Sequence, residues 1–448
     1  MKFKAHDYQK YVIDYIKTHP ICMIILQMGL GKSVSSATAV ADMLFDTFEV
    51  HKVLIIAPLR VGRDTWPAEF KKWDHLNNIR YSVAIGTEAQ RREALKKDAD
   101  VYIINRDVLP WLVDESGISC DFDTIIIDEI SASFSNGKSK RFRALMKIRP
   151  FAKRVIGLTG TPLANADLQQ LFYQYLLLDM GERFSRFITK FRDCYLRPDK
   201  RNGSIIYSYK PLPGAVDEVY KKISDITISM KSVDHLKMPE LITTNVEVEL
   251  SDSELKKYKA FKDELTLELE GGEVTADNAA ALAGKLIQIA GGAVYNDDKE
   301  VIKIHDRKLD ALEDIIESCG GPLLISYWYK HELSRIKERF DVREILTSKD
   351  IEEWNEGKIP VGIIHPVSAG YGLNLQGCSH NLVFMTLPWA LDTYQQTIAR
   401  LWRQGQQSDT VVVQNLICKG TMDEKILSAL ESKNTSQEKL LEAVKACL

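Results

Sequence analysis

The stretch ICMIILQMGLGKSVSSATAVADML, residues 21–44, reads as a strand, a glycine loop and a helix in succession. Its first six residues are all apolar, which is typical of a strand covered on both faces. The loop nearly matches the phosphate-binding pattern G-x-x-x-x-G-K-[ST]: Gly31, Lys32 and Ser33 fit, but Leu26 stands where the first glycine is expected. Backbone N–H groups in such a loop point at phosphates. The stretch therefore predicts a nucleotide site, with a chance glycine-rich turn as the alternative.

Similar apolar runs recur along the chain, separated by segments of helical length. The first series continues with VLIIA (53–57), VYII (101–104), TIIID (124–128) and RVIGL (154–158). A second series consists of LLIS (323–326), VGIIH (361–365), NLVFM (381–385) and VVVQNLI (411–417). Unbroken Val, Ile and Leu runs indicate parallel sheets with helices on both faces. The predicted fold class is therefore α/β, with two doubly wound parallel sheets in tandem.

The sequence pattern between the two series of apolar runs predicts where the two lobes divide. Residues 164–196 look helical, and NVEVEL (245–250) alternates with period two, as a half-buried edge strand does. Ser251 and Glu254 have capping-box spacing ahead of a helix. We expect an N-terminal lobe over 1–239 with a helical insertion at about 164–235. A C-terminal lobe over 240–448 would carry a second helical insertion at about 251–292.

Composition excludes several classes of protein. With 448 residues, 45% hydrophobic and 27% charged, the chain has the make-up of a soluble globular protein. It shows neither a signal-peptide core nor an apolar run near the roughly 18 residues of a membrane span, so a cytoplasmic protein is expected. Its seven cysteines include no C-x-x-C pair, which argues against a zinc site or a disulfide framework.

A net charge of −3 argues against coating nucleic acid by bulk electrostatics, although a local basic face is possible. One candidate lies between Lys138 and Arg154, where there is no acid. Two interpretations are open: a solvated helix face, or a surface next to DNA. Eight cations make up this basic run: Lys138, Lys140, Arg141, Arg143, Lys147, Arg149, Lys153 and Arg154.

An acid pair follows the strand TIIID. Asp128 and Glu129 lie at its carboxyl end, where two buried acids would be costly unless they face a metal or a cleft. Asp128 is suited to hold nucleotide-bound magnesium with Ser33, and Lys32 to reach the β and γ phosphates. Glu129 would orient or deprotonate an attacking water, which a hydrolase needs.

Two arginines lie in YQQTIARLWRQGQ (394–406). Arg400 and Arg403 are three apart on an expected helix and would share a face. They are either solvated charges of an amphipathic helix or arginine fingers that neutralise the γ-phosphate when two lobes close.

Taken together and in this order, the motifs resemble helicase superfamily two motors of the SWI/SNF type. Over about residues 6–430, the likeness adds HDYQ (6–9) and APLRVGRDTWPAEFKKW (57–73). GLTGTPLAN (157–165) resembles the third motif of the family, SAGYGLNLQG (368–377) the fifth, and the arginine segment 394–406 the sixth. The resemblance implies two RecA-like lobes, ATP and Mg²⁺ as cofactors, and a set of site residues. Those for ATP are Gln9, Gly29, Leu30, Gly31, Lys32, Ser33, Gly372 and Gln396, and those for coupling and DNA are Pro58, Arg60, Trp66, Asn105, Thr159, Gly160, Thr161, Ser368, Ala369 and Gly370.

Three departures from the family pattern stand out. Leu26-Gln27 replaces the usual acidic pair, so a missing glycine at 26 is ordinary for the family but the missing acids are not. Ser131 replaces the usual histidine of the DEAH-like box, which puts its contact with the third motif in doubt. Tyr371 stands where a second glycine of the fifth motif is common.

The resemblance implies movement along double-stranded DNA through sequence-independent backbone contacts, without obligatory strand separation. A near-minimal motor of phage or bacterial type is expected, possible partners being a separate nuclease or a replication or recombination protein. Two alternatives are open. One is a helicase of the same superfamily that unwinds RNA or single-strand-tailed DNA, and the other is an ATP-gated DNA clamp with little turnover.

Overall fold

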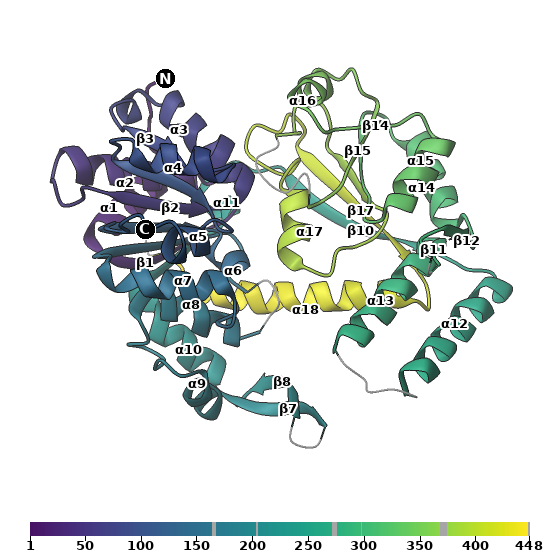
Figure 1. Ribbon diagram of the computed structural model, residues 1–448. Coiled ribbons are helices and arrows are strands. Elements are labelled where there is room, and N and C mark those ends of the chain that lie inside the picture. Colours follow the sequence, from purple (N-terminus) through teal and green to yellow (C-terminus); the bar gives the residue numbers. More distant parts are fainter. Residues whose placement is uncertain (164–166, 203–204, 271–275, 297, 368–373, 447–448) are drawn as a thin grey trace. The chain divides into compact units, whose positions relative to one another are not determined.

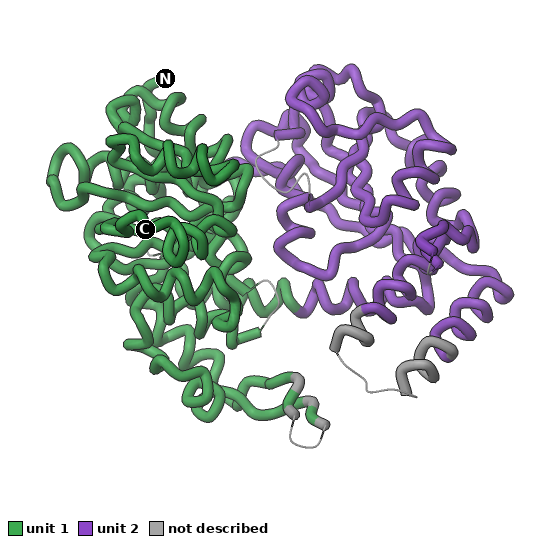
Figure 2. The backbone as a smooth tube through the Cα atoms, in the orientation of Figure 1, with its two compact units in different colours: residues 1–236, 433–448 green, residues 237–432 purple. Residues whose placement is uncertain are grey.

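The computed structural model describes residues 1–163, 167–202, 205–270, 276–296, 298–367 and 374–446. The chain divides into two compact units, shown in Figure 2. Unit 1 comprises Met1–Leu236 and Lys433–Leu448, and unit 2 comprises Lys237–Ser432.

Unit 1 is built on a seven-stranded sheet in the order β3-β4-β2-β5-β6-β1-β9 (Figure 1), and all of its pairings are parallel. The five apolar runs predicted as strands are strands. The seven strands of this sheet are β1 (Ile21–Leu26), β2 (Val53–Ala57), β3 (Tyr81–Val83), β4 (Val101–Asn105), β5 (Thr124–Asp128), β6 (Arg154–Thr159) and β9 (Thr227–Met230).

Helices cover this sheet, and most begin within a few residues of a strand end. The α-helices are α1 (Asp7–Thr18), α2 (Lys32–Phe45), α3 (Trp66–Lys72), α4 (Glu88–Lys96), α5 (Leu109–Asp114), α6 (Ile130–Ser133), α7 (Lys140–Ile148), α8 (Gln169–Asp179), α9 (Ile188–Tyr195), α10 (Ala215–Ile223) and α11 (Ser232–His235). A π-helical turn, η1 (Val61–Thr65), and three 3₁₀ turns, η2 (Asp74–Leu76), η3 (Arg149–Phe151) and η4 (Ser224–Ile226), complete the set.

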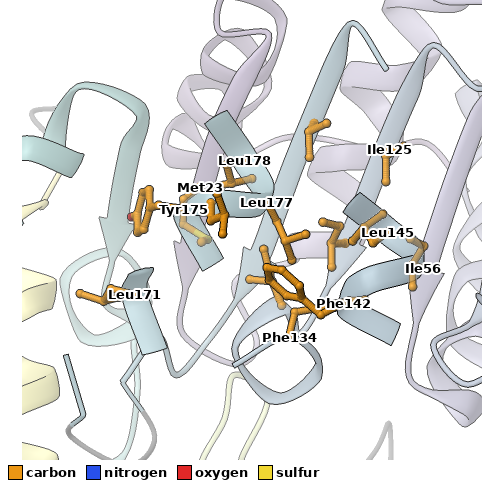
Figure 3. Packing of buried hydrophobic residues seen from close by; sticks show 14 of the residues in the cluster. Met23, Ile56, Ile125, Phe134, Phe142, Leu145, Leu171, Tyr175, Leu177 and Leu178 are labelled. Carbon is orange, nitrogen blue, oxygen red and sulfur yellow. The ribbon is translucent and has the colours of Figure 1, made fainter. Parts of the chain in front are cut away.

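The core of unit 1 lies between the sheet and its helices (Figure 3). Met23 and Ile125 contribute from strands, and Phe142 and Leu177 from α7 and α8. Each of these side chains is at most 5% exposed. Burying a large apolar side chain stabilises the fold by about 1.5–3 kcal/mol, so this cluster holds α7 and α8 against the sheet.

The helical insertion expected over 164–235 is only partly helical. An antiparallel hairpin of β7 (Leu196–Asn202) and β8 (Ile205–Pro211) interrupts it, and β9 adds an edge strand to the main sheet. The expectation was wrong there because β9 has only four residues and β7 carries mostly charged residues, so neither shows the long apolar run that was the strand signal.

The last helix, α18 (Met422–Ala443), begins in unit 2 and ends in unit 1. The expected lobe boundaries assigned residues 433–448 to the C-terminal lobe, whereas the structure groups them with unit 1. Leu440, Leu441 and Val444 enter the unit 1 core, and Ser229 of β9 exchanges backbone hydrogen bonds with Val444 (2.9 Å) and Ala446 (3.1 Å). Apolar packing and the free edge of β9 therefore group residues 440–446 with unit 1.

Unit 2 contains a six-stranded parallel sheet in the order β10-β17-β16-β13-β15-β14, and all four apolar runs of the second series are strands in it. The alternating segment lies on the edge strand β10, as predicted. The strands are β10 (Glu240–Val248), β13 (Leu323–Ser326), β14 (Arg343–Glu344), β15 (Val361–Ile364), β16 (Asn381–Phe384) and β17 (Thr410–Cys418), with a separate hairpin of β11 (Ala293–Tyr295) and β12 (Val301–Lys303).

Helices of unit 2 pack on both faces of this sheet, where two apolar clusters form its core. Ser251 and Glu254 form the predicted capping box: the Ser251 N–H donates to Glu254 Oε2 at 2.7 Å, and the Glu254 N–H donates to Ser251 Oγ at 3.3 Å. The helices are α12 (Asp252–Glu270), α13 (Ala276–Ala290), α14 (Arg307–Ser318), α15 (Lys330–Arg339), α16 (Ser348–Asn355) and α17 (Leu391–Ile398).

Candidate nucleotide site

The phosphate-loop motif forms a tight turn between β1 and α2. Gly29 and Gly31 have φ of +88° and +76°, in the left-handed region that favours glycine. A Cβ on Gly31 would lie 2.7 Å from Gln9 Nε2, so a side chain there would also collide with α1. Leu30, between them, is fully buried and anchors the loop. The helix N-terminus directly follows, so its unpaired N–H groups are available to an anion.

Lys32 lies at the carboxyl end of β1. Its ammonium donates to the Leu26 carbonyl at 3.0 Å, and a Cβ on Gly160 would come within 3.3 Å of it. The Leu26 side chain is fully buried, so position 26 serves the sheet with its side chain and the lysine with its carbonyl. Lys32 and Ser33 are both half-buried. Both therefore remain within reach of a ligand at the loop.

The acid pair lies at the end of β5. Asp128 is 4% exposed, and its Oδ2 accepts a hydrogen bond from the Trp66 indole at 2.9 Å. Burial raises the pKa of the Asp128 carboxyl, whereas the charge of Lys32 and the indole hydrogen bond act to lower it. Glu129 adopts φ +51°, ψ +53°, a left-handed conformation that costs a non-glycine residue of order 1–3 kcal/mol. Such strain is concentrated at functional sites.

The third motif contacts the turn that follows the acid pair Asp128-Glu129 directly. The Ser131 and Thr159 hydroxyls are 2.8 Å apart, and Thr159 Oγ1 also accepts the N–H of Thr161 at 3.1 Å. The contact put in doubt by the missing histidine is therefore present, made by a shorter side chain. It links α6, which follows the acids, to the loop after β6.

Sheet order explains why these motifs meet. The strands β5, β6 and β1 are neighbours, with Asp128 opposite Leu158 and Ile25 opposite Thr159. Parallel strands present their carboxyl ends at one edge. The loop lysine, the acid pair and Thr159 therefore share that edge within unit 1.

Gln27 has a role that the sequence did not reveal. Its Oε1 accepts the Ser232 N–H at 2.8 Å, Ser232 Oγ donates to the Met28 carbonyl at 3.1 Å, and the Gln27 N–H donates to the Met230 carbonyl at 3.2 Å. Three hydrogen bonds thus tie the phosphate loop to the segment joining β9 and α11. The partners lie about 200 residues apart, and no local pattern signals such a contact.

Gln9 lies in the first turn of α1 and touches the loop. Its Oε1 accepts the His6 N–H at 3.0 Å, and its Nε2 approaches the Leu30 carbonyl at 3.4 Å. The side chain is 6% exposed. This arrangement places an amide beside the loop, and the contact with ATP that the resemblance implies for Gln9 stays a prediction.

The coupling residues of unit 1 differ in exposure. Arg60 is exposed, whereas Pro58 and Asn105 are buried, Asn105 beside Ala57 at the ends of β4 and β2. Trp66 is fully buried against Asp128 and offers no surface to DNA. For Trp66, the part of the prediction that remains is a role in coupling ATP hydrolysis to movement on DNA.

The sixth-motif arginines of unit 2 do not lie on a helix, contrary to expectation. Helix α17 ends at Ile398, and Arg400 and Arg403 follow in tight turns; the Arg400 N–H donates to the Thr397 carbonyl at 3.1 Å. The turns arise because Leu401 is drawn into the core and the Trp402 indole donates to the Pro239 carbonyl at 2.8 Å. A shared helical face is therefore absent.

The second unit nevertheless brings parts of the fifth and sixth motifs together. The Arg403 guanidinium donates to the Asn374 side chain, and the Leu375 N–H donates to the Arg400 carbonyl at 3.2 Å. Burial lowers the pKa of the Arg403 guanidinium, and Gln396 is 8% exposed. Four predicted site residues and the departure at Tyr371 lie outside the described residues: Ser368, Ala369, Gly370 and Gly372.

The basic run is partly structural. Arg149 is buried and its Nε donates to the Leu177 carbonyl at 2.9 Å, while the buried Arg154 pairs with Glu49 at 2.6 Å. Neither can face DNA, which narrows the predicted surface. The exposed members are Lys138, Lys140, Arg143, Lys147 and Lys153, and all but Lys147 lack an ion pair among the described residues.

The donors at this edge suit Mg²⁺. Asp128 offers a carboxylate and Ser33 a hydroxyl, the hard oxygen ligands that this ion uses together with phosphate oxygens. No group of three or more His, Cys, Asp or Glu side chains able to hold a metal is present in the described part of the chain.

None of the described helices is long and apolar enough to cross a membrane.

Comparison with known proteins gives a consistent result. The family model of the SNF2-related domain matches residues 8–291. Putative protein p41 of Acyrthosiphon pisum secondary endosymbiont phage 1 is 37% identical, over 99% of both chains. An uncharacterized ATP-dependent helicase of Mycoplasma genitalium is 24% identical over 93% of this chain, but the chain spans only 40% of that protein.

Among solved structures, the Sulfolobus solfataricus SWI2/SNF2 ATPase core in complex with dsDNA aligns over 100% of this chain and 98% of that one, at 20% identity and a TM-score of 0.47. The domain match covers well over half of the chain, and the phage relative is similar along its whole length. The chain therefore belongs to the SNF2-related family of helicase superfamily two ATPases.

Proposed function

We propose that this protein hydrolyses ATP to move along double-stranded DNA. The observation that carries the proposal is that Lys32, Asp128 and Glu129 lie at the carboxyl edge of the unit 1 sheet, where β6 separates β1 from β5, beside a glycine loop that ends in a helix N-terminus. Membership of the SNF2-related family supports the same reaction class.

In the proposed reaction, the loop N–H groups and Lys32 bind the β and γ phosphates. Asp128 and Ser33 would hold Mg²⁺, which neutralises charge developing on the phosphates. The Trp66 indole donates to one carboxylate oxygen of Asp128 and so restrains the orientation of the carboxylate. Glu129 orients the attacking water and receives its proton.

Arg400 and Arg403 are proposed to supply positive charge to the γ-phosphate in the transition state. A guanidinium forms bidentate contacts with phosphate oxygens and stays charged under all physiological conditions. Arg403 is half-buried, so water screens such a contact only in part. Gln396 and Gln9 would complete recognition of the nucleotide.

Contact with DNA is proposed to run through its phosphate backbone and to be independent of sequence. In unit 1 the exposed cations of the basic run are candidates, together with Arg60. The hydrogen bonds between Ser131, Thr159 and Thr161 connect the helix after Glu129 to the third motif. A movement of that helix on ATP hydrolysis is therefore proposed to be transmitted to the third motif. We propose that the fifth-motif residues Ser368 to Gly370 couple ATP hydrolysis to DNA contact in unit 2.

The test is steady-state ATP hydrolysis with duplex DNA, single-stranded DNA and RNA as effectors, next to displacement of a triplex-forming strand. Strong stimulation by duplex DNA and triplex displacement without duplex unwinding are expected. Equal stimulation by RNA or single strands would contradict a duplex motor. A clamp would work as well with Glu129→Gln as with the wild type, whereas a motor variant would bind ATP and stop moving.

A further inference from the structure

A second strongly basic segment lies outside every motif used so far. Between Arg183 and Pro211 the sequence has eight cations and two acids, Asp193 and Asp199, in a chain whose net charge is −3. The cations are Arg183, Arg186, Lys190, Arg192, Arg197, Lys200, Arg201 and Lys210.

This segment forms α9 and the β7–β8 hairpin, which we name the basic arm (residues 188–211). The two strands pair only with each other and belong to no larger sheet. In Figure 1 the hairpin extends away from α9 and α10, clear of the seven-stranded sheet of unit 1. An isolated two-stranded hairpin is marginally stable in water, so its base must hold it.

The base of the basic arm is well anchored. Tyr195 and Leu196 are buried in the unit 1 core, and the Leu212 N–H donates to the Tyr195 carbonyl at 2.9 Å. The Arg192 guanidinium lies 4.6 Å from the centre of the Tyr209 ring, a stacking contact that links α9 to β8. These contacts orient the hairpin on unit 1.

The charges of the arm are only partly compensated. Lys210 pairs with Asp199 at 2.7 Å, but Arg197 lies directly opposite Lys210 across the hairpin. Like charges opposite each other destabilise a strand pair. Lys190, Arg197 and Arg201 are exposed, and none forms an ion pair with the described residues. An arrangement that costs stability and leaves cations uncompensated is explained if an anion binds there.

We propose that the basic arm binds the phosphate backbone of duplex DNA, at a place separate from the motor motifs, through Lys190, Arg197 and Arg201. The proposal rests on the proposed function, which supplies DNA as the polyanion. Several exposed cations, two on the hairpin and one on α9, fit repeated phosphates better than a single anion. Such contacts carry no base recognition, so the arm would add affinity without changing sequence preference.

The test is binding of a fluorescent duplex to the full-length protein without ATP, followed by anisotropy between 50 and 200 mM salt. Each lost phosphate contact lowers the slope of log K against log salt by about 0.9. The variant Arg197→Gln/Arg201→Gln should therefore lower the slope by about 1.8 and weaken binding in 50 mM salt by roughly tenfold or more. Arg197→Lys/Arg201→Lys keeps the charges and should keep the slope.

A matched control removes two exposed cations of unit 1 elsewhere, in Lys96→Gln/Lys97→Gln. This variant has the same net charge as the arm variant and should bind like the wild type. If the two glutamine variants lose affinity equally, or neither does, the arm has no particular role and the proposal is wrong. ATPase activity distinguishes the two levels: absent duplex stimulation in the wild type refutes the proposed function, whereas normal stimulation with an unchanged arm variant refutes only the arm.

Discussion

Each of the two units contains a lysine whose ammonium donates to a carbonyl at the end of a buried strand, but the surroundings differ. In unit 2, Lys308 donates to the Met385 carbonyl at 2.7 Å and pairs with Asp423 at 2.7 Å, and both charged side chains are at most 1% exposed. In unit 1, Lys32 donates to the Leu26 carbonyl, lies on a glycine loop and has no ion pair among the described residues. An acid at hydrogen-bond distance makes one lysine structural, and its absence makes the other available to a phosphate.

The comparison predicts opposite phenotypes for the two lysines. Lys308→Met leaves Asp423 as a buried charge without its partner and should lower the free energy of unfolding by about 3–5 kcal/mol, measured by urea denaturation. The matched variant Lys308→Met/Asp423→Leu removes both charges and should regain at least half of that loss. Equal destabilisation by the single and double variants would show that the ion pair is not the cause.

For Lys32, the loss should appear mainly in turnover and much less in stability. Lys32→Met removes a charge that contacts the phosphates, so kcat for ATP should fall by about 100- to 1,000-fold in steady-state assays. The free energy of unfolding should fall by only about 1 kcal/mol, well below the loss expected for Lys308→Met, because Lys32 is half-buried and forms no ion pair with a described acid, although its charge helps to stabilise the Asp128 carboxylate. A large loss of stability with retained turnover would reverse the assignment of the two lysines.

A smaller effect on stability and turnover is expected at Trp66, whose neutral indole donates a hydrogen bond to the Asp128 carboxylate. Trp66→Phe removes the indole donor to Asp128 and should cost about 1–3 kcal/mol of stability, with a lower kcat. Trp73→Phe is the matched control: its indole donates to Glu69 at 2.6 Å in a half-buried position away from the strand ends. The control should be milder and leave kcat unchanged. An equal fall in kcat for both variants would remove Trp66 from the site.

The smallest effect concerns the capping box of α12 and depends on pH. Partial burial acts to raise the pKa of Glu254, but hydrogen bonds from Ser251 and Arg307 outweigh it and lower the pKa to about 2. A lowered pKa means that the stabilisation is present above the unfolded value of 4.5 and is lost as the pH falls toward 2. Glu254→Gln should cost about 1 kcal/mol at pH 7 and less below pH 4. Glu338→Gln, an exposed control, should change the free energy of unfolding by less than about 0.5 kcal/mol at pH 7.

Apolar runs predicted nine strands of the two parallel sheets, because a strand covered on both faces needs little besides Val, Ile and Leu. Short or charged strands gave no such signal. β3 has three residues, β9 four, and β7 is held by its pairing with β8 and by its anchored base. The end of α18 packs on unit 1 through Leu440 and Leu441, a long-range contact that no local pattern encodes.

Within the site, the residues found from sequence are those with a local reason to be there. The loop needs Gly31 for its left-handed turn, and the acid pair marks a strand end. The sequence could not predict the contact of Gln27 with Ser232, and it put the contact of Ser131 with the third motif in doubt, because both contacts join residues that are distant in the sequence. The turn at Arg400 was mistaken for a helix because the apolar spacing continues past Ile398 while the backbone does not.

The most direct test of the central claim, that the strand ends of unit 1 hydrolyse ATP, is a single-turnover measurement on Glu129→Gln. ATP binding, followed with a fluorescent analogue, should stay within about threefold of the wild type, since the loop and Lys32 are intact. Cleavage in the presence of duplex DNA should slow by at least about 100-fold. Cleavage within tenfold of the wild-type rate, with DNA bound, would contradict the assignment of Glu129 and of this edge as the catalytic site.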